Sequence, residues 1–189
     1  MAQIVARWAD GHLKAFGQKI DELNRRFPKV LPRIVNQVGN RAKTQVVRNL
    51  TAQTGLPRKT IVAAVGNPNP ANPGKLSYEM VTRGGNIRLK YLSPMETPAG
   101  VVAKPFGKRT LYPKSFMMGG AFPDRKIVEK WDGHVMFRNR SGGRHYTFAR
   151  SGVFIPVEMT KGRTAAAFNN IAAPLLSQRV NAALARVLR

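Results

Sequence analysis

The residues best suited to chemistry in this chain are cations placed among aromatic rings. One stretch holds four basic side chains and three rings: Lys104, Phe106, Lys108, Arg109, Tyr112, Lys114 and Phe116. Rings that stack on bases, beside cations that pair with phosphates, are a common means of binding nucleic acid. The same residue types also build protein interfaces with aromatic anchors and arginine. The pattern alone does not separate these two functions.

Two further pairs of cations are placed where an anion could reach them. Arg58 and Lys59 fall at the start of an expected short helix, where positive charge opposes the helix dipole. An anionic contact and an ordinary exposed surface explain that pair equally well. Arg88 and Lys90 alternate with apolar residues, which is the period of a strand with one face on a core. The apolar residues of that strand are Ile87, Leu89 and Tyr91.

Residues for catalysis are not arranged in any recognisable constellation. The three histidines, His12, His134 and His145, lack the spacing of metal ligands. The nine carboxylates show no clustered pair suited to two-metal or glycosidic chemistry. The sequence has no phosphate-binding loop, dinucleotide fingerprint or nucleophile elbow, and it has no cysteine. We therefore expect a protein that is not an enzyme and that holds no metal or cofactor.

The charge balance is the strongest bulk property of the chain. In 189 residues, 32 lysines and arginines face nine aspartates and glutamates, for a formal net charge of +23. So many uncompensated charges would repel one another on a free monomer, so we expect a polyanionic or acidic partner. The cations are spread along the chain, which favours a folded body with broad basic surfaces over a disordered arm.

The remaining composition fits one globular domain, or one domain plus arms, made in a reducing compartment. Hydrophobic residues make up 43% of the chain, enough for a sizeable core. No run approaches the roughly 18 apolar residues of a membrane span, and the first residues do not form a signal peptide. The absence of cysteine fits folding in the cytosol. We expect no membrane partner.

The first 53 residues are expected to form amphipathic helices that act as core or as an arm. Residues 4–27 carry an apolar stripe, and Pro28 should end that helix or bend it sharply. The stripe is Leu13, Phe16, Ile20, Leu23 and Phe27. A second helix is expected to open at Pro32. Its apolar side is Ile34, Val35, Val38, Ala42, Val46 and Leu50. The two would form a helical hairpin or one long kinked arm.

Residues 54–189 are expected to form an α+β body. A short helix is predicted over residues 54–65, with Thr54 as its N-cap and Pro57 in its first turn. Its docking residues would be Ile61, Val62 and Val65. Three Asn-Pro steps make residues 66–74 a loop. Residues 75–82 and 87–92 are predicted strands joined at Gly84-Gly85. Residues 93–107, with three prolines, are expected to be a long loop that is functional or ordered on assembly.

The rest of the body is expected to alternate short strands and then turn helical. Asp132-Gly133 predicts a hairpin within residues 126–137. Residues 141–148 are expected to form a further turn and a short strand. A short helix should start at Pro156 and a long alanine-rich helix should cover residues 164–188, with Pro174 at a kink or at its start. The predicted class is α+β, with a small antiparallel sheet, long loops, N-terminal helices and a C-terminal alanine-rich helix, in a single structural unit.

Four segments resemble the minor tail protein Z family of tailed bacteriophages and prophages. They are TGLPRKTI at 54–61, GGNIRLKYLSPMETPAGVVAKPFGKR at 84–109, FMMGGAFPDRKIV at 116–128 and RSGVFIPVEMTKGRTAAAF at 150–168. The last is the most specific, because it joins a short strand, Pro156, an acidic-Met pair, Gly162 and an alanine-rich helix. The resemblance runs from about residue 50 to the end. It extends weakly to the neck and tail-completion proteins of long-tailed phages.

The resemblance implies a structural virion protein that completes the tail at its head-proximal end and helps it to join a filled head. Such neck proteins assemble as rings around the DNA channel, with a hexamer favoured. The implied partners are further copies of the chain, adjacent tail-terminator, tail-tube or head-connector proteins, and DNA in the channel. The implied location is the tail or neck of the virion, after synthesis in the host cytoplasm.

The candidate contact residues follow from the pattern of basic and aromatic residues, and the resemblance implies only the DNA channel or ring interface that they would face. The cations expected to face the DNA channel or an interface are Arg58, Lys59, Arg88, Lys90, Lys104, Lys108, Arg109 and Lys114. The expected interface aromatics are Phe106, Tyr112 and Phe116. The alternative functions are a basic nucleic-acid-binding module and an assembly factor that is not retained in the particle.

Overall fold

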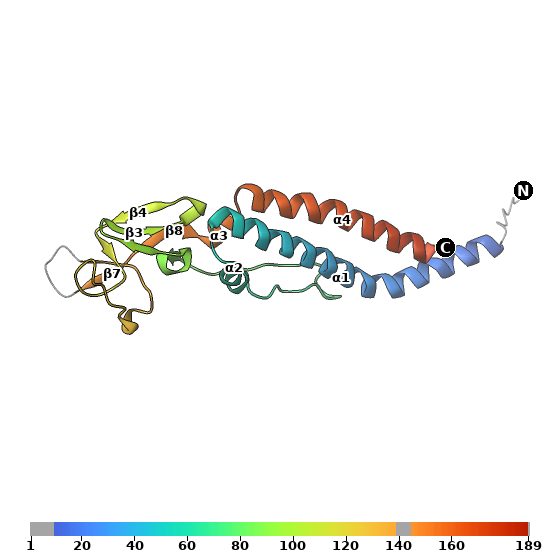
Figure 1. Cartoon of the computed structure of the whole chain (residues 1–189). Coiled ribbons are helices and arrows are strands. Elements are labelled where there is room, and N and C mark those ends of the chain that lie inside the picture. Colours follow the sequence, from blue (N-terminus) through green and yellow to red (C-terminus); the bar gives the residue numbers. More distant parts are fainter. Residues whose placement is uncertain (1–9, 139–144, 189) are drawn as a thin grey trace, which may run out of the picture. The chain divides into compact units, whose positions relative to one another are not determined.

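Helices and small antiparallel sheets make up the protein, which confirms the α+β class (Figure 1). The structure is a computed structural model that describes residues 10–138 and 145–188, with side chains for residues 18–138, 145–167 and 170–186. The chain divides into two compact units. Of the described residues, unit 1 holds those up to Arg41, Asn69–Glu79 and those from Asn170 on. Unit 2 holds Ala42–Pro68 and Met80–Asn169.

Helix α1 runs from Asp10 to Thr54 and passes through Pro28 and Pro32 without a break. The predictions that a helix ends at Pro28 and that a second opens at Pro32 are therefore wrong; of the two arrangements expected, the chain forms one long helix. Two prolines four residues apart remove only the hydrogen bonds to the carbonyls of residues 24 and 28, which lie on one side of the helix. The flanking turns keep their bonds, and the expected stripe is buried at Ile34, Val38, Ala42, Val46 and Leu50.

In unit 1, the segment Asn69–Glu79 packs on α1 through side chains instead of through a sheet. The amide of Asn36 donates to the carbonyl of Ala71 at 2.9 Å and accepts from its N–H at 2.7 Å. The hydroxyl of Tyr78 donates to Oδ1 of Asn40 at 2.9 Å. The predicted strand over residues 75–82 is wrong: the described backbone there makes only isolated bridges, Asn69↔Glu79 and Asn72↔Lys75. The helix takes the place of the missing strand partner.

Helix α2 (Arg58–Val65) begins later than predicted, because Thr54 belongs to α1. The Thr54 hydroxyl donates to the carbonyl of Leu50 at 2.6 Å and accepts from the N–H of Leu56 at 3.3 Å, so it closes α1. Pro57 is the N-cap residue of α2. Ile61 and Val65 are fully buried as expected, but Val62 is exposed, since α2 has only one covered side.

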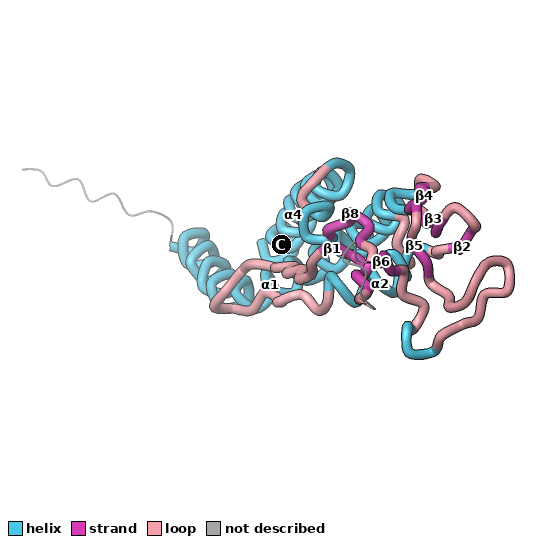
Figure 2. Tube along the Cα trace, turned by 90° about the vertical axis from the view of Figure 1, so that its left-hand side faces the viewer, coloured by secondary structure: helices cyan, strands magenta, loops and turns pink. Residues whose placement is uncertain are grey.

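The described residues of unit 2 form three small antiparallel sheets where one was predicted. Their strands are magenta in Figure 2. The first pairs β1 (Asn86–Arg88) with β8 (Arg150–Phe154). The second has the order β2 (Met95–Thr97), β3 (Gly100–Ala103), β4 (Thr110–Pro113). The third has the order β5 (Ser115–Phe116), β6 (Met136–Arg138), β7 (Tyr146–Phe148). Their inner faces, with α2 and the end of α1, enclose the core of unit 2.

Several strand predictions fail because the pairing partners are distant in sequence. The strand at 87–92 stops at Arg88 and continues as a 3-10 helix, Leu89–Leu92. No hairpin forms at Gly84-Gly85, since β1 pairs with β8. The expected long loop at 93–107 contains the hairpin β2–β3 and a 3-10 turn, Pro105–Gly107.

The last part of the body is closer to expectation. Asp132 and Gly133 form a tight turn with φ of 46° and 65°, but a 3-10 helix, Glu129–Trp131, precedes it and β6 pairs with β5 and β7 instead. The helices α3 (Ile155–Met159) and α4 (Gly162–Leu188) confirm the helical end, with Pro174 inside α4. The turn predicted at residues 141–144 lies outside the described residues. In the part of the chain that the structure describes, no helix is long and apolar enough to cross a membrane.

Candidate functional site

Most of the basic residues belong to unit 2. It contains 20 of the 32 lysines and arginines and five of the nine carboxylates of the chain. Among its described residues, ion pairs join Lys90 to Asp132 at 2.6 Å and Arg125 to Glu96. The other lysines and arginines that the structure describes in this unit form no internal ion pair, so unit 2 carries a large uncompensated positive charge.

The sheet β2–β3–β4 has one buried face and one open face. Register places Met95 opposite Val102, and Val102 opposite Leu111. Met95 is 60% exposed and Leu111 is 45% exposed, whereas Val101 and Ala103 on the other face are fully buried. We call the row Met95–Val102–Leu111 the aliphatic row. It is an apolar strip on the outside of the sheet, exposed at Met95 and Leu111 and half-buried at Val102.

Four of the predicted cations lie at the two ends of this sheet. Ala103 at the end of β3 pairs with Thr110 at the start of β4. The next residue after Ala103, Lys104, and the residue before Thr110, Arg109, therefore lie at the same end of the sheet. Lys108 directly precedes Arg109. Lys114 follows β4 at the opposite end, where its N–H donates to the carbonyl of Ala99 at 3.3 Å. All four side chains are exposed. The structure thus brings Lys104, Lys108 and Arg109 together at one end of the sheet and places Lys114 apart from them.

The pair Arg58 and Lys59 belongs to the same region of unit 2. A Cβ atom on Gly55 would lie 2.8 Å from both the carbonyl oxygen of Lys104 and the N–H nitrogen of Gly107. This backbone contact, possible only for glycine at that distance, holds the turn before α2 against the segment 104–107. Arg58 and Lys59 follow three and four residues later and are exposed.

The predicted interface aromatics fall in three different environments. Phe106 is 41% exposed and sits in the turn after β3 with φ of 55°. Tyr112 is half-buried on the inner side of β4, and burial raises the pKa of its phenol. Phe116 belongs to the other three-stranded sheet. Of the three predicted aromatic residues, Phe106 is therefore the one whose ring is exposed and close in sequence to the cations Lys104 and Lys108.

Arg88 and Lys90 have partners within unit 2. Nη1 of Arg88 lies 3.2 Å from Nε2 of His134, and its guanidinium lies 4.2 Å from the centre of the Phe148 ring. Burial, followed by the charges of Lys90 and Arg88, lowers the pKa of His134, so Nε2 accepts the hydrogen bond. The hydrogen bond and charge of Lys90 lower the pKa of Asp132. Arg88 therefore joins β1 to the turn before β6 and to the Phe148 ring of β7, and Lys90 joins the 3-10 helix Leu89–Leu92 to the same turn.

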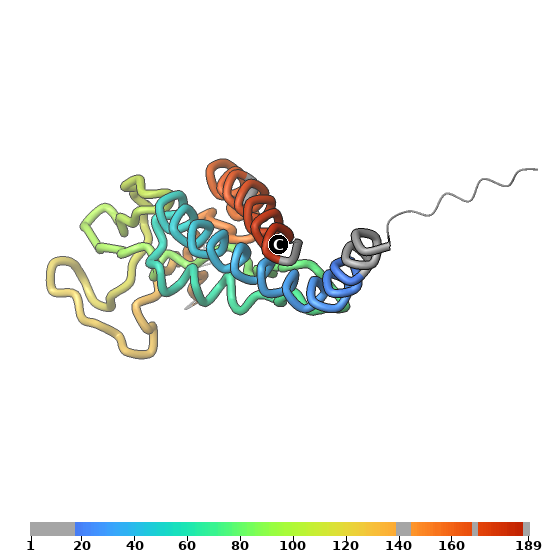
Figure 3. Tube along the Cα trace, turned by 90° about the vertical axis from the view of Figure 1, so that its right-hand side faces the viewer, coloured from blue at the N-terminus to red at the C-terminus, as the bar shows by residue number. Residues whose placement is uncertain are grey.

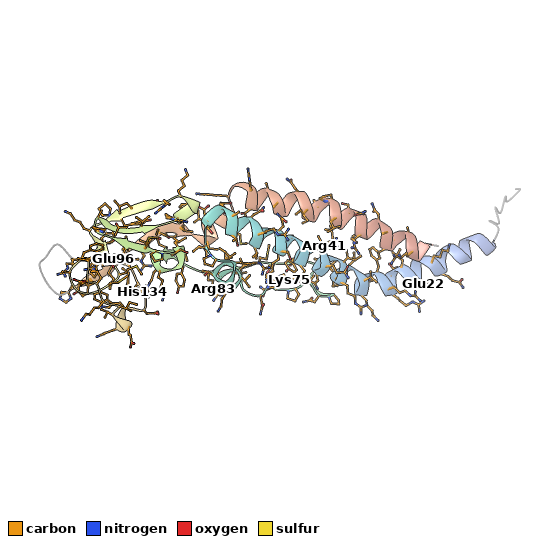
Figure 4. The ribbon with its side chains drawn as sticks, viewed as in Figure 1. Glu22, Arg41, Lys75, Arg83, Glu96 and His134 are labelled. Carbon is orange, nitrogen blue, oxygen red and sulfur yellow. The ribbon has the colours of Figure 1, made fainter. Side chains whose placement is uncertain are left out.

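Glu96, labelled in Figure 4, anchors the long connection between β5 and β6, whose path is yellow to orange in Figure 3. One carboxylate oxygen accepts from the N–H groups of Met117 and Met118 at 3.1 and 2.9 Å, and the other accepts from Arg125. The Glu96 side chain is only 5% exposed. Neither residue of this ion pair was predicted, because the sequence offers no signal for a contact between β2 and a loop 29 residues later.

A second aromatic and basic surface lies on the sheet β5–β6–β7. The rings of Phe116, Trp131 and Tyr146 meet edge to face, with centres 5.4 to 5.8 Å apart. The guanidinium of Arg138 lies 5.8 Å from the centre of the Phe116 ring. In the register of β6 and β7, Arg138 lies opposite Tyr146. Tyr146 is 40% exposed and Arg138 is exposed. Of these residues only Phe116 was predicted, because the others come from three separate segments.

These surfaces are suited to binding. In the described parts of the chain, no group of three or more histidines or carboxylates is placed to hold a metal ion. No family model, no curated protein and no solved structure matches the chain. The surfaces of unit 2 and the motifs in the sequence are the observations on which a function can rest.

Proposed function

We propose that the protein is a structural subunit of a phage tail: a minor tail, tail-completion or neck component. It forms a ring, with a hexamer favoured, at the head-proximal end of the tail and helps to join tail and head around the DNA channel. The observation that carries the proposal is the set of four motifs, of which the most specific, at residues 150–168, spans β8, α3 and the start of α4. The motif's expected order of strand, short helix and long helix agrees with these elements.

The surfaces of unit 2 support a role in assembly. A ring subunit needs at least two contact surfaces, and small domains that act alone seldom leave an aliphatic sheet face open. The aliphatic row is such a face, with Lys104, Arg109 and Lys114 around it. Because these cations repel between copies, phosphates or acidic proteins that neutralise them should further stabilise a ring of this subunit. DNA and adjacent tail or connector proteins would supply that charge.

The same surfaces support a function without catalysis. The two groups with the most unusual surroundings, Glu96 and His134, are both engaged in internal contacts. We propose that neither takes part in a reaction and that the protein acts by binding alone.

The test is the mass of the purified protein in solution and its copy number in purified particles. Native mass spectrometry should show a small fixed multiple of the subunit, and quantitative mass spectrometry of virions should give the same multiple per particle. Antibody labelling in electron micrographs should mark the head-proximal end of the tail. Absence from particles would overturn the proposal and favour an assembly factor.

A second candidate function, binding of single-stranded nucleic acid, is favoured by the cluster of Phe116, Trp131 and Tyr146 beside Arg138. An exposed ring on a sheet face with an adjacent cation can stack on a base and contact its phosphate. If this function holds, Tyr146→Ala should weaken binding of a single-stranded oligonucleotide by about 1–3 kcal/mol. Equal affinity of the variant and the wild type would exclude this surface.

A further inference from the structure

The open face of the sheet β2–β3–β4 has the composition of a protein interface. Its centre is the aliphatic row, of which Met95 and Leu111 are 60% and 45% exposed. The residues with the same orientation nearer the hairpin are Thr97, Gly100 and Pro113, none of which is charged. An apolar centre without charge, surrounded by polar groups, is the usual anatomy of a specific interface.

The rim of this face carries one sign of charge. Lys104 and Arg109 lie at one end of the strands and Lys114 at the other, all three exposed. The carboxylate in these strands, Glu96, is on the opposite face and is bound to Arg125. No described residue of the strands therefore offsets the positive rim.

We propose that this open face docks on an acidic surface of another protein. Aliphatic or aromatic side chains of the partner would cover the aliphatic row, and its carboxylates would lie opposite Lys104, Arg109 and Lys114. The inference goes beyond the proposed function, since it assigns a surface and a partner chemistry that hold whether or not the protein belongs to a virion.

Two other occupants fit the face less well. Bases bind by stacking on rings, and the row Met95–Val102–Leu111 contains none, so a nucleic acid would gain only phosphate contacts there. A second copy that used the same face would bring its own Lys104, Arg109 and Lys114 against these cations, and like charges oppose such a contact. Charge complementarity thus selects an acidic protein.

The test uses the full-length protein and a fluorescent synthetic peptide that forms an acidic helix with a leucine stripe. Two probes are compared with it by fluorescence anisotropy: the same peptide with serine in place of leucine, and a DNA duplex. We expect the leucine peptide to bind most tightly. The double variant Met95→Ser/Leu111→Ser should weaken its binding about tenfold, through the loss of two apolar contacts. Lys104→Gln/Arg109→Gln should weaken it by a similar factor and reduce its salt dependence.

Matched controls separate this face from the general charge of the protein. Leu76→Ser removes an equally exposed apolar side chain of unit 1, and Lys126→Gln/Lys130→Gln removes two exposed cations elsewhere in unit 2. Both should bind the leucine peptide within about twofold of the wild type. Leu111→Ser alone serves if the double variant does not fold.

Either of two results would overturn the proposal. In the first, Met95→Ser/Leu111→Ser or Leu111→Ser binds the leucine peptide as tightly as the wild type. In the second, the DNA duplex binds more tightly than the peptide and loses affinity in the same variants, which would assign the face to nucleic acid. Neither result bears on the copy number in particles, so the proposed function is judged separately.

Discussion

The ring of Tyr78 lies directly on the backbone of Gly39. A Cβ atom at position 39 would fall 2.3 Å from Cγ of the tyrosine, closer than side-chain carbons approach in folded proteins. The Tyr78 hydroxyl donates to Asn40 on the next position of the helix, and burial raises the pKa of the phenol. Glycine occurs in the middle of α1 because the segment Asn69–Glu79 crosses the helix there.

Gly39→Ala should therefore destabilise the protein although alanine favours helix. The gain in helix propensity is about 1 kcal/mol, whereas overpacking of a close contact costs about 1–3 kcal/mol and would displace Tyr78. Thermal unfolding followed by circular dichroism should show a lower midpoint. In a Tyr78→Ala background the same substitution should raise the midpoint, because the clash is gone. Equal destabilisation in both backgrounds would contradict this account.

Glu96→Gln should cost far more stability than its conservative chemistry suggests. The amide keeps an acceptor for Met117 and Met118 but leaves Arg125, whose side chain is 19% exposed, without its counter-charge. Breaking one side of a buried ion pair costs about 3 kcal/mol. Urea unfolding measures the loss, and limited proteolysis should show earlier cleavage between β5 and β6.

The control for Glu96 is an exposed ion pair of similar chemistry. Lys75 and Glu79 pair at 2.6 Å with half-exposed side chains. Because exposed pairs contribute little, Glu79→Gln should leave the urea midpoint unchanged. A loss at Glu79 as large as that at Glu96 would show that burial is not the cause.

His134 should make the protein less stable in mild acid. Burial, then Lys90 and Arg88, lower its pKa below the ordinary value of 6.5, while Asp132 opposes this more weakly. As the pH falls below about 6.5, the unfolded chain takes up the proton first, so the free energy of unfolding decreases until the folded protein is also protonated. Above that pH both states are neutral and this contribution does not change.

The variant His134→Gln isolates this effect, because glutamine retains an acceptor for Arg88 but does not titrate. Urea unfolding of both proteins from about pH 7.5 to about pH 5 should show a smaller decline for the variant. Parallel declines would mean that other groups, such as the carboxylates, cause the acid sensitivity.

Neutralising the cations at one end of the sheet β2–β3–β4 should impair function and not folding. Lys104, Lys108 and Arg109 are exposed, so the triple change to glutamine should leave the unfolding midpoint nearly unchanged. On the proposed function, particles made with this variant should fail to join heads to tails or to retain DNA. Fully infectious particles would remove these three residues from the candidate site.

The local signals in the sequence predicted the helices well and the strands poorly. The end helices α3 and α4 follow from Pro156, Gly162 and an alanine-rich run, which act within a few residues. Strand β1 depends on β8, more than 60 residues later, and no local pattern encodes that partner. The alternation at Leu76, Tyr78 and Met80 was misleading: Leu76 is 50% exposed, Tyr78 packs on Gly39 of α1, and Met80 packs against the core of unit 2. Pro28 and Pro32 are tolerated since the long apolar stripe of α1 continues beyond them.

The candidate site was predictable only where its residues are close in sequence. Lys104, Lys108 and Arg109 occupy one turn, so their clustering was visible. The aliphatic row was not, because the positions of Met95, Val102 and Leu111 coincide only in the register of three strands. The same holds for Trp131, Tyr146 and Arg138. Arg88 was correctly placed in a strand, whereas Lys90 lies in the 3-10 helix that follows it, and their partners His134 and Asp132 lie more than 40 residues away.

The pairing of β1 with β8 also sets the order in which unit 2 can fold during synthesis. Asn86 pairs with Phe154, so most of the sheet residues emerge from the ribosome before the strand that closes the loop around them. Until then Leu89 and Val101, fully buried in the finished protein, lack the cover of Val153 and Ile155. Such late, long-range closure is slow and leaves apolar surface open to wrong contacts. Until its final strand and helices have been made, a nascent chain of this protein therefore exposes apolar side chains that the finished protein buries.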